Sequence, residues 1–599
     1  MQKKLLSLLC ASMLSMGAVG YAQSADQAIA AVLSYGFVDL EGAKPSAIIV
    51  EYKKPVLASS ISKNTFTVED YAKQQIAKNG FQAAIERYGD AVPGNEGEIT
   101  RVYVNSVASP SKKDGTAIGK YVILELNTNY MLSGQNLMYT TSMLAGVKQN
   151  LPVKAADGET IQPEDTFIRN YTESQETDNR RGKDSRIEKG FAQAEEGKQH
   201  ENRTRTVIMT DPKKIILPQF APGSGWNLHH IEDGSALAAT HCYSEYTGEY
   251  TDFSLPYAMY VPDAKVLETH KGKLPVVLHM EHAGANSTDP MASLTSSMAA
   301  AKLTDPAFQK KHPAIVLVPQ VNDAHRSTND YVASSDANTA IWELLDSVLN
   351  QYKDYVDTRR IYGTGQSMGG MLLLNMAAQR DNFFAGMALV GAQWSNNYDK
   401  WLENSNSPAR TPENDPISFN GFGLDKDNYQ NWYYMISDDN ILVHTCAGDP
   451  MATGEWNAVK DYYQAAGKPI ATASLDPCEP LSRQEDIDRK LTRQQNNKPG
   501  GGILWGTFTR GSHMSTWKYG YQLSTPLEWL FTQRRSTEMK RGKLEQLKRP
   551  WLGRDALGKI LPGSGTAGLN SAQYTPEGAS TIYKEGWTPE SVRKALAKS

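Results

Sequence analysis

The sequence contains very little cysteine. Its 599 residues include four cysteines, of which Cys10 lies in an apolar N-terminal segment. The remaining Cys242, Cys446 and Cys478 are odd in number, so at most one bridge can form within the chain. Cys446 ends one expected strand and Cys478 follows the next, which predicts a disulfide between them in an oxidising compartment. The alternative is three unpaired thiols.

An excess of either charge is also absent. The chain has 62 Lys and Arg against 66 Asp and Glu, a formal net charge of −4. Without a basic surplus, binding to nucleic acid or to an anionic membrane surface is not expected. Beyond the N-terminal segment, no run approaches the roughly 20 apolar residues of a membrane-spanning helix, so no membrane span is expected.

One long apolar run lies at the N-terminus. Lys3 and Lys4 precede the apolar residues 5–19, and small residues at Gly20 and Ala22 suit a cleavage position. This order is typical of a cleavable signal peptide over residues 1–22. We therefore expect an exported protein, secreted or periplasmic.

Length and pattern divide the rest of the chain. A chain of 599 residues is too long for one hydrophobic core. Residues 28–150 alternate apolar and polar positions between Pro, Gly, Ser and Asn clusters, which predicts a β-sandwich. Residues 151–224 are interpreted as a polar linker or insertion, because charged and polar residues dominate positions 172–206. Residues 536–599 read as a mostly irregular tail.

Strands and helices alternate over residues 225–535. The strand-forming runs are almost continuously apolar, which indicates a parallel sheet covered by helices on both faces and hence the α/β class. A stretch rich in Asn, Asp, Tyr and Trp at about 394–440 is expected to form a cap over this sheet. The expected strands include residues 275–279, 314–319, 385–390, 441–445 and 470–473.

A Gly-x-Ser-x-Gly motif centred on Ser367 is the most informative feature. Ile361 and Tyr362 predict a strand before it, and the apolar residues 371–378 predict a helix after it. A sharp strand-to-helix turn lifts a serine hydroxyl clear of its backbone, and Gly365 and Gly369 avoid Cβ collisions across that turn. Ser367 is therefore the predicted nucleophile. The alternative is an ordinary glycine-rich turn.

The partners of such a serine follow in the order acid, then histidine. Two histidines come after Ser367. His444 falls inside an expected strand, where packing in the core is its expected role, whereas His513 lies in a Gly/Ser loop and is the predicted base. Asp449 follows the strand 441–446 and is the predicted acid. The competing carboxylates are Asp438, Asp439 and Asp476.

The oxyanion hole is expected to use two backbone N–H groups. Met368 follows the nucleophile, and Ala283, with Gly284 as an alternative, lies in a loop after an early strand. His282 in that loop is also a candidate substrate contact, with Gln366 and Trp394 elsewhere. His279 and His282 lack a third ligand at a plausible spacing, so neither a metal nor another cofactor is expected.

These segments carry a family resemblance. Residues 355–371, which contain the turn Gly365-Gln366-Ser367-Met368-Gly369, resemble the nucleophile region of secreted polyhydroxybutyrate-depolymerase-like esterases and putative peptidases. Residues 513–517 leading into 529–535 resemble the same family. Residues 35–42 and 119–126 resemble the immunoglobulin-like domain that precedes some of these esterases. The resemblance implies an α/β-hydrolase with Ser367, Asp449 and His513 at the family's catalytic positions. The loop His282-Ala283-Gly284 departs from the family's usual His-Gly.

The resulting hypothesis is an exported serine carboxylesterase acting on a small-molecule or polymeric ester through an acyl-enzyme. Two alternatives stay open. One is a peptidase that uses the same three residues. The other is an inert protein that binds a polymer or a surface.

Overall fold

The computed structural model describes residues 27–40, 42–70, 98–111, 113, 115–127, 143–177, 204–210, 212–244, 249–282, 285, 287–321, 335–379, 383–392, 436, 439–466, 470–494 and 501–535. The expected signal peptide and C-terminal tail lie outside these residues, as does the expected cap apart from residues 436, 439 and 440. Within the described ranges, no helix is long and apolar enough to cross a bilayer.

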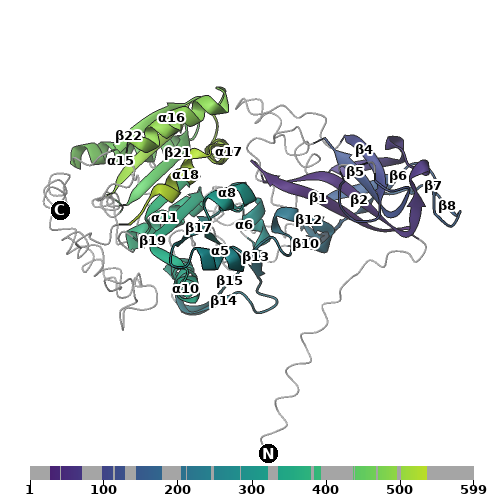
Figure 1. Ribbon diagram of the computed structural model, residues 1–599, viewed down its shortest axis with the longest axis horizontal. Coiled ribbons are helices and arrows are strands. Elements are labelled where there is room, and N and C mark those ends of the chain that lie inside the picture. Colours follow the sequence, from purple (N-terminus) through teal and green to yellow (C-terminus); the bar gives the residue numbers. More distant parts are fainter. Residues whose placement is uncertain are drawn as a thin grey trace, which may run out of the picture.

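The N-terminal region is a β-sandwich (Figure 1). Among the described residues, one sheet has the order β12-β1-β2-β5-β4 and a second has the order β3-β6-β9. Two further pairs of strands, β7-β8 and β10-β11, are antiparallel. The strands are β1 (Ile29–Asp39), β2 (Gly42–Leu57), β3 (Phe66–Asp70), β4 (Ile99–Asn105), β5 (Ile118–Leu126), β6 (Ala145–Gln149), β7 (Val153–Lys154), β8 (Thr160–Ile161), β9 (Ile168–Arg169), β10 (Tyr171–Thr177), β11 (Thr204–Thr210) and β12 (Ile215–Ile216). Short 3₁₀ turns are η1 (Ala58–Ser60), η2 (Lys63–Thr65), η3 (Pro212–Lys214) and η4 (Pro218–Phe220).

Alternation along β2 explains the sandwich. Ile48 and Val50 face the core between the two sheets, where they join Val147 of β6. Ile49, between them, belongs to a second cluster with Ile123 on the opposite face. Because successive strand residues point to opposite faces, an apolar period of two places one row inside the sandwich.

Part of the segment interpreted as a linker (residues 151–224) is built into these sheets. Val153, Ile161 and Ile168 are buried in the sandwich core, and β9 pairs with β6. Near the other end of the segment, β12 runs parallel to β1. The sequence interpretation gave most weight to the polar stretch and too little to these isolated apolar residues, which acquire partners only through non-local pairing.

The larger region is an α/β sheet of mostly parallel strands. Over the described residues its order is β13-β16-β18-β17-β19-β20-β21-β23-β22. β16 is antiparallel to both of its neighbours, β13 and β18, and every pair from β18-β17 to β23-β22 is parallel. The strands are β13 (Trp226–His229), β14 (Leu237–Ser244), β15 (Glu249–Leu255), β16 (Tyr257–Tyr260), β17 (Leu274–Met280), β18 (Ile315–Pro319), β19 (Val356–Gln366), β20 (Gly386–Val390), β21 (Asn440–Cys446), β22 (Ile470–Leu475) and β23 (Gly502–Phe508), of which β14 and β15 form a separate hairpin. The helices are α5 (Ala264–Thr269), α6 (Met291–Thr295), α7 (Ala299–Leu303), α8 (Pro306–Lys311), α10 (Ser335–Gln351), α11 (Met368–Gln379), α15 (Pro450–Ala466), α16 (Leu481–Arg493), α17 (Ser515–Gln522) and α18 (Thr525–Thr532).

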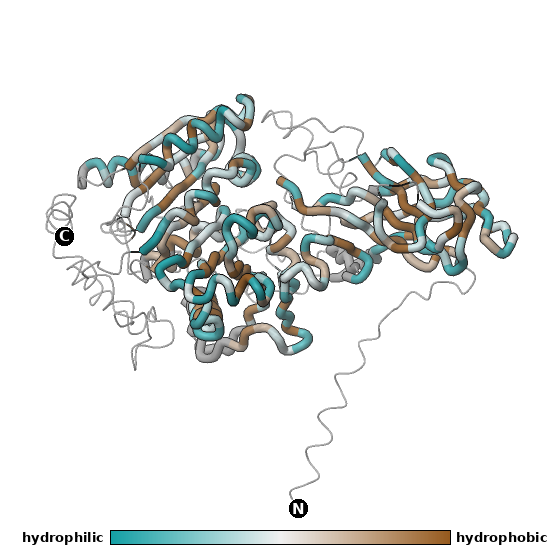
Figure 2. Tube along the Cα trace, in the orientation of Figure 1, coloured by the Kyte–Doolittle hydropathy of each residue, from teal (hydrophilic) through white to brown (hydrophobic). Residues whose placement is uncertain are grey.

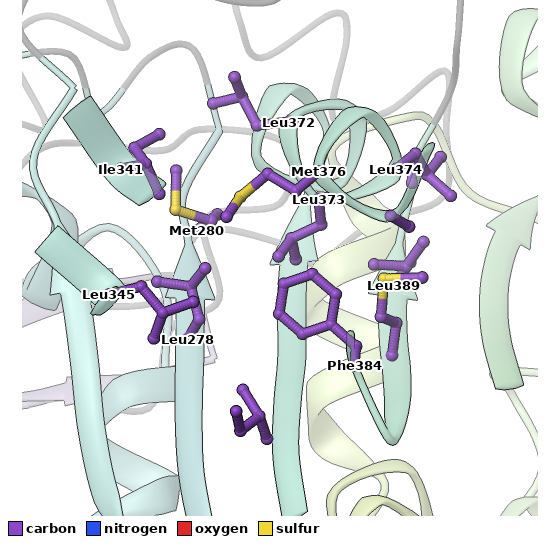
Figure 3. Close-up of a cluster of buried hydrophobic side chains, with 14 of the residues drawn as sticks. Leu278, Met280, Ile341, Leu345, Leu372, Leu373, Leu374, Met376, Phe384 and Leu389 are labelled. Carbon is purple, nitrogen blue, oxygen red and sulfur yellow. The ribbon is translucent and has the colours of Figure 1, made fainter. Parts of the chain in front are cut away.

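Helices cover both faces of this sheet. On one face, Leu278 of β17 packs in a cluster with residues of α10, α11 and α15. On the other face, Val277 packs in a cluster with residues of α7, α16 and α18. Figure 3 shows Met376 of α11 beside Met280 of β17 and Leu374 of α11 above Leu389 of β20, on the first face. Figure 2 shows apolar stretches along the chain in this region. The predicted class, an α/β region with a mostly parallel sheet preceded by an all-β sandwich, is confirmed.

The predicted disulfide between Cys446 and Cys478 is absent. Cys446 is buried, Cys478 is exposed, and no bond joins them. The prediction assumed that β21 and β22 are neighbours, but β23 lies between them. Strands two places apart are separated by roughly 10 Å, beyond the reach of about 7 Å between disulfide Cα atoms. Cys242 lies on a strand whose side chains are not described.

The sandwich and the α/β region are joined by a continuous apolar contact. Gln219 accepts a hydrogen bond from the Val38 N–H at 2.7 Å, which fastens the end of β1 to η4. Phe220 then meets Trp226 of β13 edge-on, with ring centroids 5.8 Å apart. Val38 and Trp226 belong to the same buried cluster, so the first strand of the large sheet is supported by the sandwich.

Candidate active site

Ser367 occupies a sharp turn between β19 and α11. Its φ of 50° is the only positive φ of a non-glycine residue within the described ranges. Its N–H donates to the Val390 carbonyl at 3.0 Å, and its own carbonyl accepts from the Met371 N–H at 3.1 Å. Left-handed backbone at a residue with a Cβ is strained and persists only where its surroundings enforce it. Here β20 and α11 enforce it, and the strained turn is the one expected of an exposed nucleophile.

The glycines beside Ser367 allow close backbone contact with β17. A Cβ at Gly369 would lie 2.1 Å from the Met280 carbonyl oxygen, and one at Gly365 would lie 2.9 Å from the same oxygen. A Cβ at Gly365 would also lie 2.9 Å from the Gly369 carbonyl carbon. The two glycines therefore let the turn close on itself and on the end of the neighbouring strand.

His513 joins Ser367 to Asp449. Its Nε2 lies 2.8 Å from the Ser367 Oγ, and its Nδ1 lies 2.5 Å from the Asp449 Oδ2. The His513 side chain is 30% exposed and that of Asp449 is 4% exposed. The structure thus brings together all three residues predicted for the triad, with a reachable imidazole and a buried carboxylate.

Two paired loops hold the acid and the base. Asp449 follows β21, and His513 lies between β23 and α17. The Gly448 N–H donates to the Gly511 carbonyl at 3.1 Å, and a Cβ at Gly448 would lie 2.3 Å from that carbonyl oxygen. The other carboxylate oxygen of Asp449 accepts from the Ala452 N–H at 3.2 Å. The carboxylate is therefore oriented from two sides.

Asp476, Asp439 and His444, the other candidates for the acid and the base, lie at other places in the sheet. Asp476 follows the edge strand β22 and lies 3.5 Å from the Arg510 guanidinium, on the far side of β23 from β19. Asp439 is buried at the opposite end of β21, and Asp438 lies outside the described residues. His444 is buried within β21, with its Nε2 2.8 Å from the Asp488 carboxylate, in agreement with a role in the core.

The described residues include only one of the two predicted oxyanion donors. Met368 is the first residue of α11, so its N–H has no acceptor within the helix and lies directly after Ser367. Ala283, Gly284 and Trp394 lie outside the described residues.

His282, next to the predicted oxyanion loop, is 4% exposed. Its ring stacks on Trp517 with centroids 5.3 Å apart and planes 2° apart. Trp517 in turn meets the His513 ring edge-on at 5.3 Å. His282 therefore contacts Trp517, and Trp517 contacts the predicted base His513.

Gln366 was expected to contact substrate, and the structure places it differently. Its side chain is fully buried, and its amide donates to the Glu281 carboxylate at 2.6 Å. Successive strand residues point to opposite faces, and this one points away from the surface on which Ser367 opens. The sequence interpretation did not single out Glu281, although a glutamate directly after a mostly apolar strand is a sign of a buried, paired carboxylate.

Two ionisable groups near the turn have shifted pKa values. Burial lowers the pKa of His282 to about 4, against the attraction of Glu281 and with repulsion from His513 and His279. Burial alone would raise the pKa of Glu281, but His279, His282 and Ser297 hold it below its usual range. His282 is therefore neutral and Glu281 ionised at neutral pH.

A buried lysine fastens the helix that follows His513. The Lys302 ammonium donates to the carbonyls of Tyr521 at 2.7 Å and Leu523 at 2.6 Å, at the C-terminal end of α17. A cation at this end satisfies carbonyls that lack helical partners. Burial lowers the pKa of Lys302 to about 8. Its charge is retained at neutral pH, so the helix stays capped.

Because the pKa of His282 is lowered, we expect the free energy of unfolding to decrease as the pH falls. In the unfolded chain this imidazole takes up a proton as the pH falls through about 6.5, whereas in the folded protein it does so only near 4. The contribution of His282 to the free energy of unfolding is therefore fully present above pH 6.5 and is lost as the pH falls from 6.5 to 4. Between pH 7 and pH 5 this loss is about 2 kcal/mol. Urea denaturation of the wild type and His282→Phe at both pH values measures this. An equal pH dependence in the two proteins would contradict the prediction.

A family model agrees with the N-terminal sandwich. Residues 37–188 match the family model described as the esterase Ig-like N-terminal domain, a range that runs past the residue 150 predicted as the end of the sandwich. No curated protein matches the chain.

Several hydrolases are among the solved structures that a structural comparison matches to this chain. A thermostable esterase is 17% identical, with a TM-score of 0.46, covering 85% of this chain and 100% of its own. A ferulic acid esterase is 15% identical, with a TM-score of 0.29, covering 50% of this chain and 97% of its own. The acylaminoacyl peptidase of Pyrococcus horikoshii is 11% identical, with a TM-score of 0.28, covering 51% of this chain and 43% of its own.

Proposed function

We propose that this chain, an α/β-hydrolase preceded by an esterase-type immunoglobulin-like domain, is an exported serine carboxylesterase. The observation that carries the proposal is the continuous contact from the Ser367 Oγ through the His513 imidazole to the Asp449 carboxylate. Export rests on the signal-peptide pattern of residues 1–22, and the substrate is a small-molecule or polymeric ester.

The geometry supports an acyl-enzyme mechanism. As the Ser367 Oγ attacks the ester carbonyl carbon, the His513 Nε2 takes the hydroxyl proton. Asp449, bound to Nδ1, keeps the imidazole in the tautomer whose Nε2 can accept that proton, and stabilises the imidazolium that forms. The imidazolium then protonates the leaving alcohol. Water, deprotonated by the same imidazole, attacks the acyl-enzyme and releases the acid.

The negative charge of the tetrahedral intermediate needs donors beside Ser367. The Met368 N–H at the start of α11 is suited to this, because the positive end of the helix dipole favours negative charge there. Ala283 is the proposed second donor. Trp517 packs edge-on against the His513 ring, and His282 stacks on Trp517.

A fluorophosphonate probe tests the proposal. We expect it to modify the purified protein at one site, the Ser367 Oγ, because the probe reacts with serines activated by a neighbouring base. Mass spectrometry of the digested adduct identifies the site, and heat-unfolded protein serves as the control that should not react. Labelling at another serine, or none in protein that hydrolyses p-nitrophenyl acetate, would contradict the assignment. An unlabelled and inactive folded protein would favour the inert binding hypothesis.

A further inference from the structure

A buried carboxylate lies behind the nucleophile turn. Glu281, the first residue after β17, is 3% exposed. Its Oε1 lies 2.6 Å from the His279 Nε2 and accepts from the Ser297 hydroxyl at 2.7 Å. Its Oε2 accepts from the Gln366 amide at 2.6 Å. Both carboxylate oxygens are therefore bound by groups from three different parts of the chain.

His279 connects this carboxylate to the strand that leads into Ser367. Its two ring nitrogens face the Glu281 carboxylate at 2.6 Å and the Thr364 carbonyl at 3.3 Å. The imidazole therefore lies between Glu281 and the backbone of β19.

The bonded groups lie on the two segments that matter for the proposed chemistry. Gln366 directly precedes Ser367, and Glu281 lies two residues before Ala283 in the chain. The backbones of these segments also touch, since a Cβ at Gly369 would lie 2.7 Å from the Glu281 carbonyl oxygen. The bond between Gln366 and Glu281 thus connects the turn that bears Met368 to the loop that follows β17.

Filling a core with a hydrogen-bonded carboxylate is less favourable in free energy than filling it with apolar side chains. A buried carboxylate loses its hydration, and replacing a buried polar group by a well-packed apolar one is often neutral or stabilising. A carboxylate with directed donors has a further effect. It fixes the distance between the elements that it joins. Donors to an oxyanion must be placed to within a fraction of an ångström to be effective.

We propose that Glu281 is a positioning residue that sets the spacing between the Ser367–Met368 turn and the loop after β17, and thereby shapes the oxyanion hole. The inference rests on the proposed function. Glu281 touches neither Ser367 nor His513 in the contacts described, and it acts through Gln366.

Exchanging the two partners tests this. In Glu281→Gln, the new NH₂ group faces the Gln366 NH₂ group. Turning the Gln366 amide over restores one bond, but the ionised acceptor shared by Gln366, Ser297 and His279 is lost. In Gln366→Glu, two carboxylates meet in the core. The double variant Glu281→Gln with Gln366→Glu restores one donor and one acceptor at the same place. The readouts are kcat and KM for p-nitrophenyl acetate and the urea midpoint of each protein.

We expect Gln366→Glu to lose about 10- to 100-fold in kcat, and Glu281→Gln less, with KM changed less than about threefold, because a misplaced donor weakens binding of the transition state rather than of the ester. The double variant should recover at least about tenfold over Gln366→Glu. The inference is wrong if folded Gln366→Glu keeps kcat within about twofold of wild type, or if the exchange brings no recovery. Should Gln366→Glu not fold, Gln366→Leu removes the same bond without adding a buried charge and should show the same loss of kcat.

Asp488→Asn is a matched control. Asp488 is fully buried and lies 2.8 Å from the His444 Nε2, so it forms a second buried pair of histidine and carboxylate away from the turn. This variant should lower the urea midpoint and keep kcat within about twofold. A tenfold loss of kcat in folded Asp488→Asn would mean that any buried pair has this effect, and would overturn the specific role of Glu281. Failure of the proposed function is distinct, because the wild type itself would then neither turn over esters nor react with the fluorophosphonate.

Discussion

Replacing Ser367 with alanine will lower kcat for p-nitrophenyl acetate by at least about 10⁴-fold. Alanine removes the Oγ that lies 2.8 Å from the His513 Nε2, and no other hydroxyl is bonded to that nitrogen among the described residues. The turn itself should survive. Alanine keeps the Cβ and the φ of 50°, so the free energy of unfolding is expected to stay within about 1 kcal/mol of wild type. Steady-state kinetics and urea denaturation measure the two quantities.

Ser524→Ala is the control for this experiment. Its hydroxyl donates to the Glu485 carboxylate at 2.8 Å, between α16 and α18. Removing it should lower the free energy of unfolding by about 1 kcal/mol and leave turnover unchanged. Wild-type turnover by Ser367→Ala would show that another group is the nucleophile.

Asp449→Asn is expected to lower kcat by about 10⁴-fold at neutral pH while the protein stays folded. The carboxylate accepts from the His513 Nδ1 at 2.5 Å, which leaves Nε2 able to take the serine proton. An asparagine can turn its NH₂ group toward Nδ1, which then holds the ring in the opposite tautomer. It also supplies no charge to stabilise the imidazolium. The bond from the Ala452 N–H can be made by the asparagine oxygen, so the start of α15 should remain intact.

Asp476→Asn provides the comparison. Asp476 also follows a strand next to β23 and competes with Asp449 in the sequence, but it accepts from the Cys478 N–H and lies near Arg510. Kinetics of the two variants under the same conditions should separate them by about three orders of magnitude or more. Similar losses in both variants, or a larger loss in Asp476→Asn, would reassign the acid.

Neighbouring strands do not by themselves choose between these two aspartates. Both β21 and β22 flank β23, the strand before His513. The difference is that β21 lies on the side of β23 nearer to β19, while β22 is the outer edge. The pairing of Gly448 with Gly511 then fixes the Asp449 loop against the His513 loop. The sequence indicated Asp449 because it follows a strand at the expected place in the chain. The contact between the two loops explains why the residue at this place meets His513.

Other interpretations depended on contacts that no local pattern contains. The expected substrate contact at Gln366 is a buried bond to Glu281, because the side chain that precedes Ser367 points to the inner side of the turn. The expected disulfide failed because β23, which follows β22 in the chain, is inserted between β21 and β22 in space. In each case the partner comes from a distant part of the chain.

The amino-acid sequence alone determined the types of the elements, the strained glycine-flanked serine and the order of the three candidate catalytic residues. These follow from local backbone preferences and from apolar periodicity, which act over a few neighbouring residues. The tertiary structure alone decided which strands are neighbours, which carboxylate meets His513 and where Glu281 finds its three partners. These depend on packing between segments far apart in the chain, where burial forces each polar group to find a partner.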